Sequence, residues 1–332
     1  MLNLIVDAMG GDNGAAAAVE GVKQAIAENN DFRVTLVGRQ QELEPLLDGF
    51  VYNDKISIVH AEDIIEMSES PVTAIRTKKN SSMVVGFNLL KDHAGDAFIT
   101  SGSTGAMITG ATLIVRRAKN VERAALAPLI PTLKGTWTQL VDCGANSDCK
   151  ASHLKQFAIM GSVYMNTVEN VEAPRIALLN NGTEEEKGCA LTKEAYQLLK
   201  ETDSINFIGN IEARDAFAGN CDVIVCDGFT GNILMKALEG ATGAMIKMIK
   251  TELMATTKAK IGAALSKQAF KNVKTRMDYR EYGGALLLGV NGGVVKAHGN
   301  SDARAFKNTI LQTKRFAENN VVNNIIDRLS NQ

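Results

Sequence analysis

The chain has 332 residues, of which 45% are hydrophobic and 22% charged, and its formal net charge at pH 7 is −1. This composition is typical of a soluble globular protein with enough length to bury a sizeable core. The near-neutral balance and the 5% aromatic content argue against nucleic acid as a partner, because such binders usually carry a basic face and aromatic stacking platforms.

Cysteine and histidine usage indicates neither disulfides nor a metal site. The five cysteines form no CxxC pair, and the four histidines are scattered along the chain. The first segment, MLNLIVDAMGGD, has no basic start and predicts a strand instead of a signal peptide. We therefore expect reduced thiols in a cytoplasmic protein. Neither GxGxxG nor GxxxxGK[ST] occurs, so no nucleotide cofactor is expected.

Strand-like and helix-like segments alternate along most of the chain. The strand-like runs cover residues 2–6, 33–37, 56–60, 97–100, 140–143, 175–179, 205–208 and 222–226. Segments with helical periodicity lie between most of them, at 15–28, 71–91, 153–166 and 191–200. This alternation predicts a mostly parallel sheet with helices on both faces. The uncharged stretch 97–115 reads as a buried strand, a glycine-rich turn and a helix instead of a membrane span.

No linker divides the chain, so we predict a single α/β domain over residues 1–332. Residues 247–276 stand out because they hold eight basic residues against one acid, Glu252. Apolar residues recur there at near-helical spacing, which predicts an amphipathic helical arm at about residues 240–280. Its basic face is either a solvated surface or a contact for an acidic protein or an anionic membrane. The residues predicted for such contact are Lys247, Lys250, Lys258, Lys260, Lys267 and Lys271.

Polar loops containing glycine follow four of the predicted strands. They lie in LNLIVDAMGGDN, AFITSGSTGAM, TQLVDCGANSDCK and DVIVCDGFTGN. Glycine lets the backbone turn close to a ligand, and the N–H groups that open the next helix bind anions. Because strand ends meet at one edge of a parallel sheet, we predict a shared anion site there. Each loop could alternatively be an ordinary capped helix start.

The candidate binding residues come from these loops and from PVTAIRTKKNSS, which opens a predicted helix with Pro71. Arg76 and Lys79 are three positions apart and are expected to share a helix face, or else to be solvated. Asn232 and Lys236 lie one helical turn apart. The complete set is Asp7, Gly10, Gly11, Asp12, Arg76, Lys79, Ser101, Ser103, Thr104, Gly144, Asn146, Asp227, Asn232 and Lys236.

Two segments offer residues for the chemical step. DCGANSDCKASH places Lys150 where it could contact an anion and His153 where it could transfer a proton. In the alternative, Asp148 or Ser152 caps the helix and Lys150 is solvated. The glycine-rich residues 281–302 bring Lys296 and His298 together, and we expect His298 to be either a proton-transfer group or a structural histidine.

The motifs in order resemble one bacterial family. DAMGGD, RTKKNSS, SGSTGA, VDCGANSDCK, QFAIMGSVY, LTKEAYQLLK, CDGFTGN, YGGALLLGV and KAHGNSD are closely similar to the acyl-acyl carrier protein:phosphate acyltransferases of phospholipid synthesis. The resemblance runs nearly end to end. It implies a three-layer α/β/α Rossmann-like fold related to the isocitrate and isopropylmalate dehydrogenases, a homodimer, and peripheral association with the membrane. The chain departs from the family's usual pattern at Ser103, Ala124 and Ala213.

The resemblance implies transfer of a long-chain acyl group from the thioester of acyl carrier protein to inorganic phosphate. The product would be an acyl phosphate for glycerol 3-phosphate acylation. Further implied partners are an anionic membrane surface and the downstream membrane acyltransferase. We expect the Gly10, Gly102 and Gly144 loops, with Lys79 or Lys150, to hold phosphate. Carboxylates expected either to orient donors or to cap helices are Asp7, Asp12, Asp142 and Asp227.

Three alternative functions are also compatible with the sequence. One is a phosphotransacetylase-like enzyme that acts on short acyl-CoA, and another is a dehydrogenase of the related fold, which the missing dinucleotide motif disfavours. The third is a membrane scaffold that binds acyl carrier protein without turnover.

Overall fold

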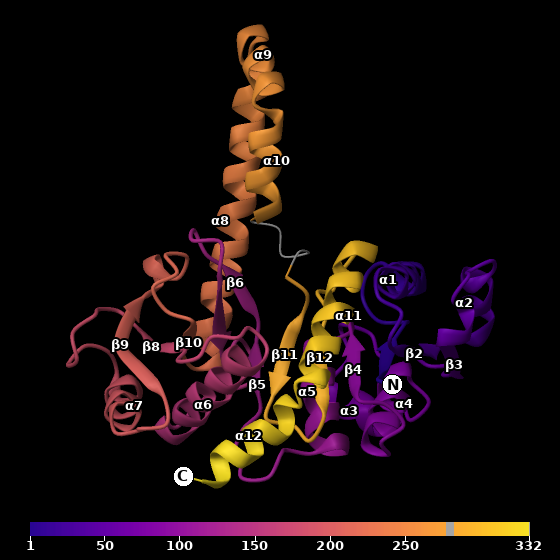
Figure 1. The fold of residues 1–332 in the computed structure, drawn as a ribbon, viewed down its shortest axis with the longest axis horizontal. Coiled ribbons are helices and arrows are strands. Elements are labelled where there is room, and N and C mark those ends of the chain that lie inside the picture. Colours follow the sequence, from indigo (N-terminus) through magenta and orange to yellow (C-terminus); the bar gives the residue numbers. More distant parts are fainter. Residues whose placement is uncertain (277–281, 332) are drawn as a thin grey trace.

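The computed structural model describes residues 1–276 and 282–331, and their strands form two sheets (Figure 1). The first sheet has seven strands in the order β3-β2-β1-β4-β12-β11-β5. These strands are β1 (Asn3–Asp7), β2 (Arg33–Gly38), β3 (Ile56–His60), β4 (Ala97–Thr100), β5 (Ala125–Ala127), β11 (Ala285–Leu288) and β12 (Gly293–Lys296). Only β11 runs against its neighbours, β5 and β12.

The second sheet has five strands in the order β6-β7-β10-β8-β9. They are β6 (Leu129–Pro131), β7 (Trp137–Val141), β8 (Arg175–Asn180), β9 (Asn206–Glu212) and β10 (Val223–Val225). β6 is antiparallel to β7, and the other pairs are parallel. The prediction of mostly parallel strands is therefore confirmed, but they are divided between two sheets.

Helices accompany both sheets. The helices that follow strands of the first sheet are α1 (Gly14–Glu28), α2 (Gln40–Leu47), α3 (Pro71–Thr77), α4 (Ser82–Lys91), α5 (Thr104–Gly110) and α11 (Ala303–Glu318). The π-helical turn η2 (Ala111–Val115) extends α5. Around the second sheet lie α6 (Ala151–Thr167), α7 (Ala190–Lys200) and α12 (Val321–Ser330). The single-turn 3₁₀ helices are η1 (Asn53–Lys55) and η3 (Ala213–Asp215).

The buried apolar residues show how the layers are held together. Successive residues of β1 point to opposite faces, so Leu4 and Val6 join one buried cluster and Ile5 joins another. The cluster of Leu4 and Val6 also contains Val141 of β7 and Val223 of β10. One apolar core therefore continues from the first sheet to the second.

The segment 71–91, predicted as one helix, forms two. α3 begins with Pro71, as expected, and ends at Thr77, and the N–H of Ser81 donates to the carbonyl oxygen of Lys78 at 3.1 Å. Ser81 then caps α4, because its Oγ accepts a hydrogen bond from the Val84 N–H at 3.4 Å. A serine with extended backbone at this position starts a new helix, which the apolar periodicity alone did not indicate.

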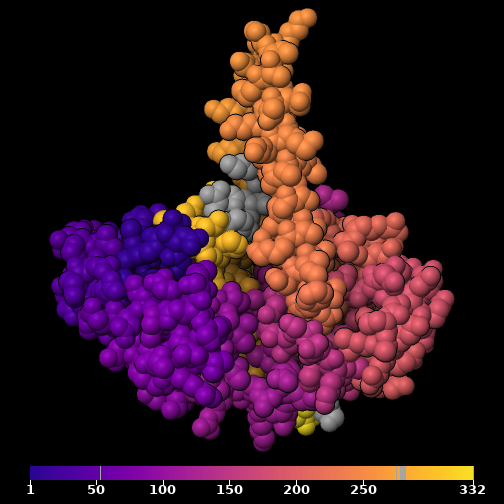
Figure 2. Space-filling view, turned by 180° about the vertical axis from the view of Figure 1, so that it is seen from behind, coloured from indigo at the N-terminus to yellow at the C-terminus, as the bar shows by residue number. Residues whose placement is uncertain are grey.

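The predicted arm protrudes from the body and consists of three helices (Figure 1). They are α8 (Gly228–Ala255), α9 (Thr257–Leu265) and α10 (Lys267–Arg276). Figure 2 shows from the opposite side that the arm projects from the rest of the molecule. The six lysines predicted for partner contact are all exposed there. Its apolar residues are exposed too, including Met245, Met248, Ile261 and Leu265. The end of the predicted arm near residue 280 lies outside the described residues.

Within residues 1–276 and 282–331, no helix combines the length and the apolar character that crossing a bilayer requires. The uncharged stretch 97–115 forms β4, a turn, α5 and η2, as the sequence predicted.

Candidate functional site

Three neighbouring parallel strands of the first sheet, β1, β4 and β12, end side by side and bring Asp7, Thr100 and Lys296 together. Thr100 lies opposite Lys296 in the register of β4 and β12. The carboxylate of Asp7 accepts hydrogen bonds from Thr100 Oγ1 at 2.7 Å and from the Met9 N–H at 3.1 Å. Burial raises the pKa of Asp7, and these donors oppose the shift.

The loops after β1 and β4 touch each other through glycine. A Cβ atom on Gly10 would lie 2.6 Å from the backbone nitrogen of Gly102, so a side chain at position 10 would collide with the second loop. Ser101 Oγ donates to the Gly10 carbonyl oxygen at 2.7 Å, and the Gly102 N–H donates to Thr100 Oγ1 at 3.0 Å. Ser103 caps α5 through its Oγ, which accepts from the Ala106 N–H at 3.4 Å. Ser101 and Ser103 therefore hold the loops in place.

Lys296 is a buried cation at this edge, with 7% of the residue exposed. Its Nζ donates to the carbonyl oxygen of Ser101 at 3.0 Å and also to that of Ala297. Burial lowers the pKa of Lys296 to about 8, while the nearby carboxylates of Asp7 and Asp12 oppose the shift. At pH 7 this ammonium is still mostly charged, so it suits an anionic ligand.

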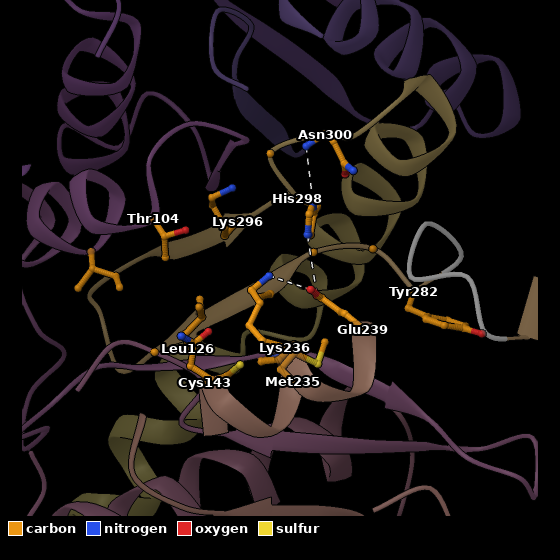
Figure 3. Close-up of a pocket in the computed structure, with 18 of the residues that line it drawn as sticks. Thr104, Leu126, Cys143, Met235, Lys236, Glu239, Tyr282, Lys296, His298 and Asn300 are labelled. Atoms are coloured by element: carbon orange, nitrogen blue, oxygen red, sulfur yellow. Dashed lines mark hydrogen bonds and ion pairs between the residues drawn. The ribbon is translucent and has the colours of Figure 1, made fainter. Parts of the chain in front are cut away.

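A cavity of about 600 Å³ lies between these loops, α5 and the first turns of α8. Figure 3 shows His298 pointing toward Glu239, which also reaches Lys236. Lys296 and Asn300 lie on the same side of the cavity as His298, and Leu126, Cys143 and Met235 lie on another side. The apolar lining consists of Met67, Ile108, Leu126, Pro128, Leu129, Met235 and Ala285. The cavity can therefore accept a ligand with an anionic group and an apolar group.

Glu239 lies within reach of both Lys236 and His298 in the cavity. Its Oε2 is 2.7 Å from Lys236 Nζ, and its Oε1 is 3.9 Å from His298 Nε2. His298 Nδ1 accepts a hydrogen bond from the Asn300 N–H at 3.5 Å, so the neutral imidazole carries its proton on Nε2, facing Glu239. Burial lowers the pKa of His298, and Glu239 opposes the shift. His298 is therefore mainly neutral at pH 7 and can exchange a proton.

Cys143 is the thiol that lines the cavity, but it is not a nucleophile. Burial raises its pKa to about 12, with the charge of Asp142 adding to the effect. Since the thiolate is the reactive form, Cys143 is an inert wall of the cavity at neutral pH.

The structure brings part of the predicted set to this cavity. The predicted residues that line it are Asp12, Thr104, Gly144, Asn232, Lys236 and His298. Asp227 caps α8 instead, because its carboxylate accepts from the Thr230 N–H at 2.9 Å and from Thr230 Oγ1 at 2.7 Å. It borders a second cavity, on another face of α8.

The loop after β7 is organised around the buried carboxylate of Asp142. This carboxylate accepts from the N–H groups of Leu126, Ala145 and Asn146, at 2.7 to 3.1 Å. The Asn146 amide donates to Asp142 at 2.8 Å and to the carbonyl oxygen of Ala124 at 2.7 Å. The Asn146 amide is therefore occupied by contacts within the protein.

Lys150 and His153 lie at the start of α6, outside the cavity lining. The Lys150 N–H donates to His153 Nδ1 at 3.1 Å, and His153 Nε2 is 3.3 Å from Glu122 Oε2. Lys150 itself occupies the N-cap position, so neither Asp148 nor Ser152 caps this helix. The Lys150 side chain is exposed, as the alternative to an anion-contacting Lys150 expected.

Arg76 and Lys79 do not share a helix face, because α3 ends at Thr77 and Lys79 lies in the turn beyond it. Both residues are exposed, and neither lines the cavity. The i to i+3 argument failed because the helix stops between the two positions.

Sequence reasoning missed Glu239 and gave Lys296 no role of its own. Glu239 could have been predicted, because it follows Lys236 by three positions and residues three apart on a helix are neighbours. Lys296 was noted only as a neighbour of His298, since the strand that ends with it was not predicted.

The chain is similar to known proteins of one family. The chain matches the family described as "Fatty acid synthesis protein" over residues 2–324. It is 47% identical over 329 residues to the phosphate acyltransferase of Clostridium botulinum strain ATCC 19397, covering 99% of this chain and 98% of that protein. It is 45% identical over 330 residues to the phosphate acyltransferase of Clostridium perfringens strain SM101, covering 99% and 97%.

Solved structures resemble the fold. A phosphotransacetylase from Streptococcus pyogenes superposes with a TM-score of 0.63 at 16% identity, covering 96% of this chain and 94% of that chain. A branched-chain phosphotransacylase from Enterococcus faecalis gives a TM-score of 0.57 at 12% identity, covering 96% and 99%. These similarities confirm the predicted Rossmann-like α/β/α fold.

Proposed function

The chain belongs to the fatty acid synthesis protein family and is an acyltransferase, and we propose that its acceptor is inorganic phosphate and its donor the thioester of acyl carrier protein. The acyl group is a long fatty chain, and the product is an acyl phosphate that serves glycerol 3-phosphate acylation in phospholipid synthesis.

The observation that supports this proposal is the composition of the cavity. The buried ammonium of Lys296 and the ammonium of Lys236 line the same space as an apolar wall. A buried cation needs an anionic partner, which phosphate supplies. The apolar wall suits the hydrocarbon next to the thioester.

The reaction requires no covalent enzyme intermediate. A phosphate oxygen attacks the thioester carbonyl carbon, the new C–O bond forms, and the C–S bond breaks. The proton of hydrogen phosphate then passes to the leaving thiolate, so acyl phosphate and free carrier thiol are formed. Lys296 and Lys236 hold the phosphate, and the first N–H groups of α5, at Thr104 and Gly105, stabilise the oxyanion. His298, beside Glu239, passes the proton.

The decisive measurement is phosphate-dependent release of carrier thiol from long-chain acyl carrier protein. We expect thiol release to saturate with phosphate and to disappear when sulfate replaces phosphate at equal ionic strength. Release at the same rate without phosphate would mean that the enzyme is a hydrolase. Faster turnover of acetyl-CoA than of the acyl carrier substrate would instead favour the phosphotransacetylase alternative.

We further propose that the arm mediates two associations. Part of its exposed apolar surface packs against the arm of a second copy in a homodimer. Its lysines contact an anionic membrane surface, where the downstream membrane acyltransferase receives the reactive product. Sedimentation of the purified protein tests the dimer, and a monomer at micromolar concentration would contradict it. Reversing Lys247, Lys250 and Lys258 to glutamate should abolish flotation with phosphatidylglycerol vesicles, and unchanged flotation would contradict the membrane role.

A further inference from the structure

A second basic surface lies at the opposite end of the molecule from the arm tip. The chain between η2 and β5 passes there (Figure 1), and its residue Asn120 is bonded to Ser330 at the end of α12 at 3.0 Å. We call it the basal surface, formed by residues 116–123 and the start of α6. Its cations are Arg116, Arg117, Lys119, Arg123, Lys150 and Lys155.

Contacts between the two segments hold the basal surface together. The Glu122 N–H donates to Gln156 Oε1 at 2.8 Å, and Arg117 Nη1 donates to the Glu122 carbonyl oxygen. The Gln156 amide donates in turn to the carbonyl oxygen of Asn120 at 2.9 Å. The positions of the exposed cations relative to α6 are therefore fixed by the fold.

The positive charge of this surface is poorly neutralised. Its acids are Glu122, whose carboxylate lies against His153, and Asp148. Within residues 1–276 and 282–331, no carboxylate lies within 4.0 Å of Arg116, Lys119 or Arg123. An acidic partner would supply the missing counter-charge.

The backbone of Arg116 is held in a conformation that favours glycine. Its φ is 74° and its ψ is 165°. The Arg116 N–H donates to the carbonyl oxygen of Ala111, and its own carbonyl oxygen accepts from the Asn291 N–H, both at 2.8 Å. An arginine kept at such a position is strained, and strained residues concentrate at functional surfaces.

The basal surface adjoins the cavity. Arg123 is followed by Ala124, whose carbonyl oxygen accepts the Asn146 amide at 2.7 Å. The Cys143 N–H donates to the carbonyl oxygen of Leu126 at 2.8 Å. Leu126, Cys143 and Gly144 all line the cavity, and Gly144 is exposed. Only a few residues therefore separate the unneutralised cations from the exposed rim at Gly144.

We propose that the basal surface is the docking site of the acidic carrier protein that presents the acyl thioester. This inference rests on the proposed function and assigns the carrier to the end of the molecule opposite the arm tip. The carrier's thioester arm enters the cavity past Gly144, while the arm of the enzyme remains available to the membrane. Lys150, which the sequence suggested as a phosphate ligand, contacts the carrier in this arrangement.

The test compares two thioesters of the same fatty acid, one on acyl carrier protein and one on free pantetheine. In the variant K119E/R123E we expect at least a tenfold higher KM for the acyl carrier substrate. The KM for acyl-pantetheine and the KM for phosphate should both stay within twofold of wild type. The wild-type KM for the carrier substrate should rise with salt, and that of the variant should not.

The matched control is K91E/K193E, which makes the same change of net charge at exposed positions on α4 and α7. It should leave the KM for the carrier substrate unchanged. Thermal melting checks that both double variants are folded. An unchanged carrier KM in K119E/R123E would overturn the proposal, and so would a tenfold increase in K247E/K250E on the arm with no increase in K119E/R123E.

Direct binding separates this inference from the proposed function. Fluorescence anisotropy of labelled holo-carrier is measured on the same proteins, and K119E/R123E should weaken binding at least tenfold. If the wild-type enzyme turns over neither thioester with phosphate, the proposed function fails, but the binding result still decides the docking site. Equal affinity of wild type and variant would overturn it.

Discussion

Two loops of this protein have nearly the same sequence pattern but do different work. Asp7 is the last residue of β1, Asp142 comes directly after β7, and each is a buried carboxylate two or three residues before a glycine. Asp7 lies close enough to the buried Lys296 to oppose the lowering of its pKa. Asp142 is surrounded by N–H donors from Leu126, Ala145 and Asn146. The carboxylate of Asp7 thus stabilises the positive charge of Lys296 at the cavity, whereas the carboxylate of Asp142 stabilises the backbone turn after β7.

The difference teaches that a strand, an aspartate, glycine and a helix do not define a ligand site by themselves. Such a loop forms a ligand site only if a cation and a cavity lie opposite it. We therefore expect substitutions near the end of β12 to lower the rate, and substitutions around β7 to change stability.

The largest effect is expected for Lys296→Met. Losing the buried ammonium removes a charged contact to phosphate, so kcat/KM for phosphate should fall about 10²–10³-fold. Lys296→Arg, which keeps a positive charge, should retain more activity than Lys296→Met. Steady-state kinetics with varied phosphate measures both variants, and wild-type kcat/KM in Lys296→Met would remove Lys296 from the site.

The same lysine gives a pH dependence with a definite sign. Since the pKa of Lys296 is lowered to about 8, its ammonium is lost as the pH rises through 8, and phosphate affinity should fall above that value. Lys296→Arg should not show this loss. Between about pH 8 and pH 10.5 the unfolded lysine binds a proton that the folded one does not, so folding stability should rise with pH relative to Lys296→Met. Urea unfolding at several pH values measures this slope.

Asp142→Ala should destabilise the protein by about 3 kcal/mol, because it leaves several buried donors without an acceptor. Chemical denaturation gives the free energy of unfolding. Asp7→Ala removes fewer hydrogen bonds, so its loss of stability should be smaller and its loss of rate larger. A larger loss of stability in Asp7→Ala, or a larger loss of rate in Asp142→Ala, would contradict the different roles proposed for the two loops.

His298→Gln should lower kcat about 10²-fold with a small change in the KM for phosphate. Glutamine keeps a polar side chain but cannot pass a proton at neutral pH. His153→Gln is the matched control, because His153 also lies beside a glutamate but is outside the cavity lining. Equal losses of kcat in both variants would argue against a specific role of His298.

Gln139→Leu should stabilise the protein by about 1 kcal/mol. Gln139 lies in β7, is fully buried, and neither polar atom of its amide has a hydrogen-bond partner. Replacing an unpaired buried amide by an apolar side chain of similar size removes a desolvation penalty. The melting temperature measures the gain, and a lower one would show that the amide has a partner in solution.

The smallest effect is expected for Cys143→Ala, which should change kcat by less than about threefold because the thiol is protonated at neutral pH. Stoichiometric labelling of wild type by iodoacetamide at Cys143 would contradict this.

Eight strands were predictable from the sequence, whereas β5, β6, β11 and β12 were not. β1, β2, β3, β4, β7, β8, β9 and β10 each overlap a predicted apolar run. β5, β6, β11 and β12 have only three or four residues, but β4 and β10 are equally short, so length alone does not explain the difference. Pro128 and Pro131 interrupt the apolar run that contains β5 and β6. β12 also sits among glycines and pairs with β4, which is distant in the sequence. Without β12 and its neighbour β11, the division into two sheets could not be anticipated.

Because β12 was not predicted from the sequence, the prediction of the candidate site was incomplete. His298 and Lys236, both predicted from the sequence, line the cavity, and their roles there stay predictions. Lys296 could be given a role only once β12 was known to end beside Thr100. Lys150 carries the right residue type, but the course of the chain after β7 puts it on the outside.

α8 is one uninterrupted helix of 28 residues, about 42 Å long, that lines the cavity with its first turns and continues into the arm. The direction in which a side chain of the α8 part of the arm points therefore depends on how many residues separate it from the cavity-lining residues of the same helix. One residue inserted just after Glu239 would leave the cavity wall in place and turn the rest of α8 by about 100°. Helical phase, as much as charge, thus determines which side of the arm meets a partner.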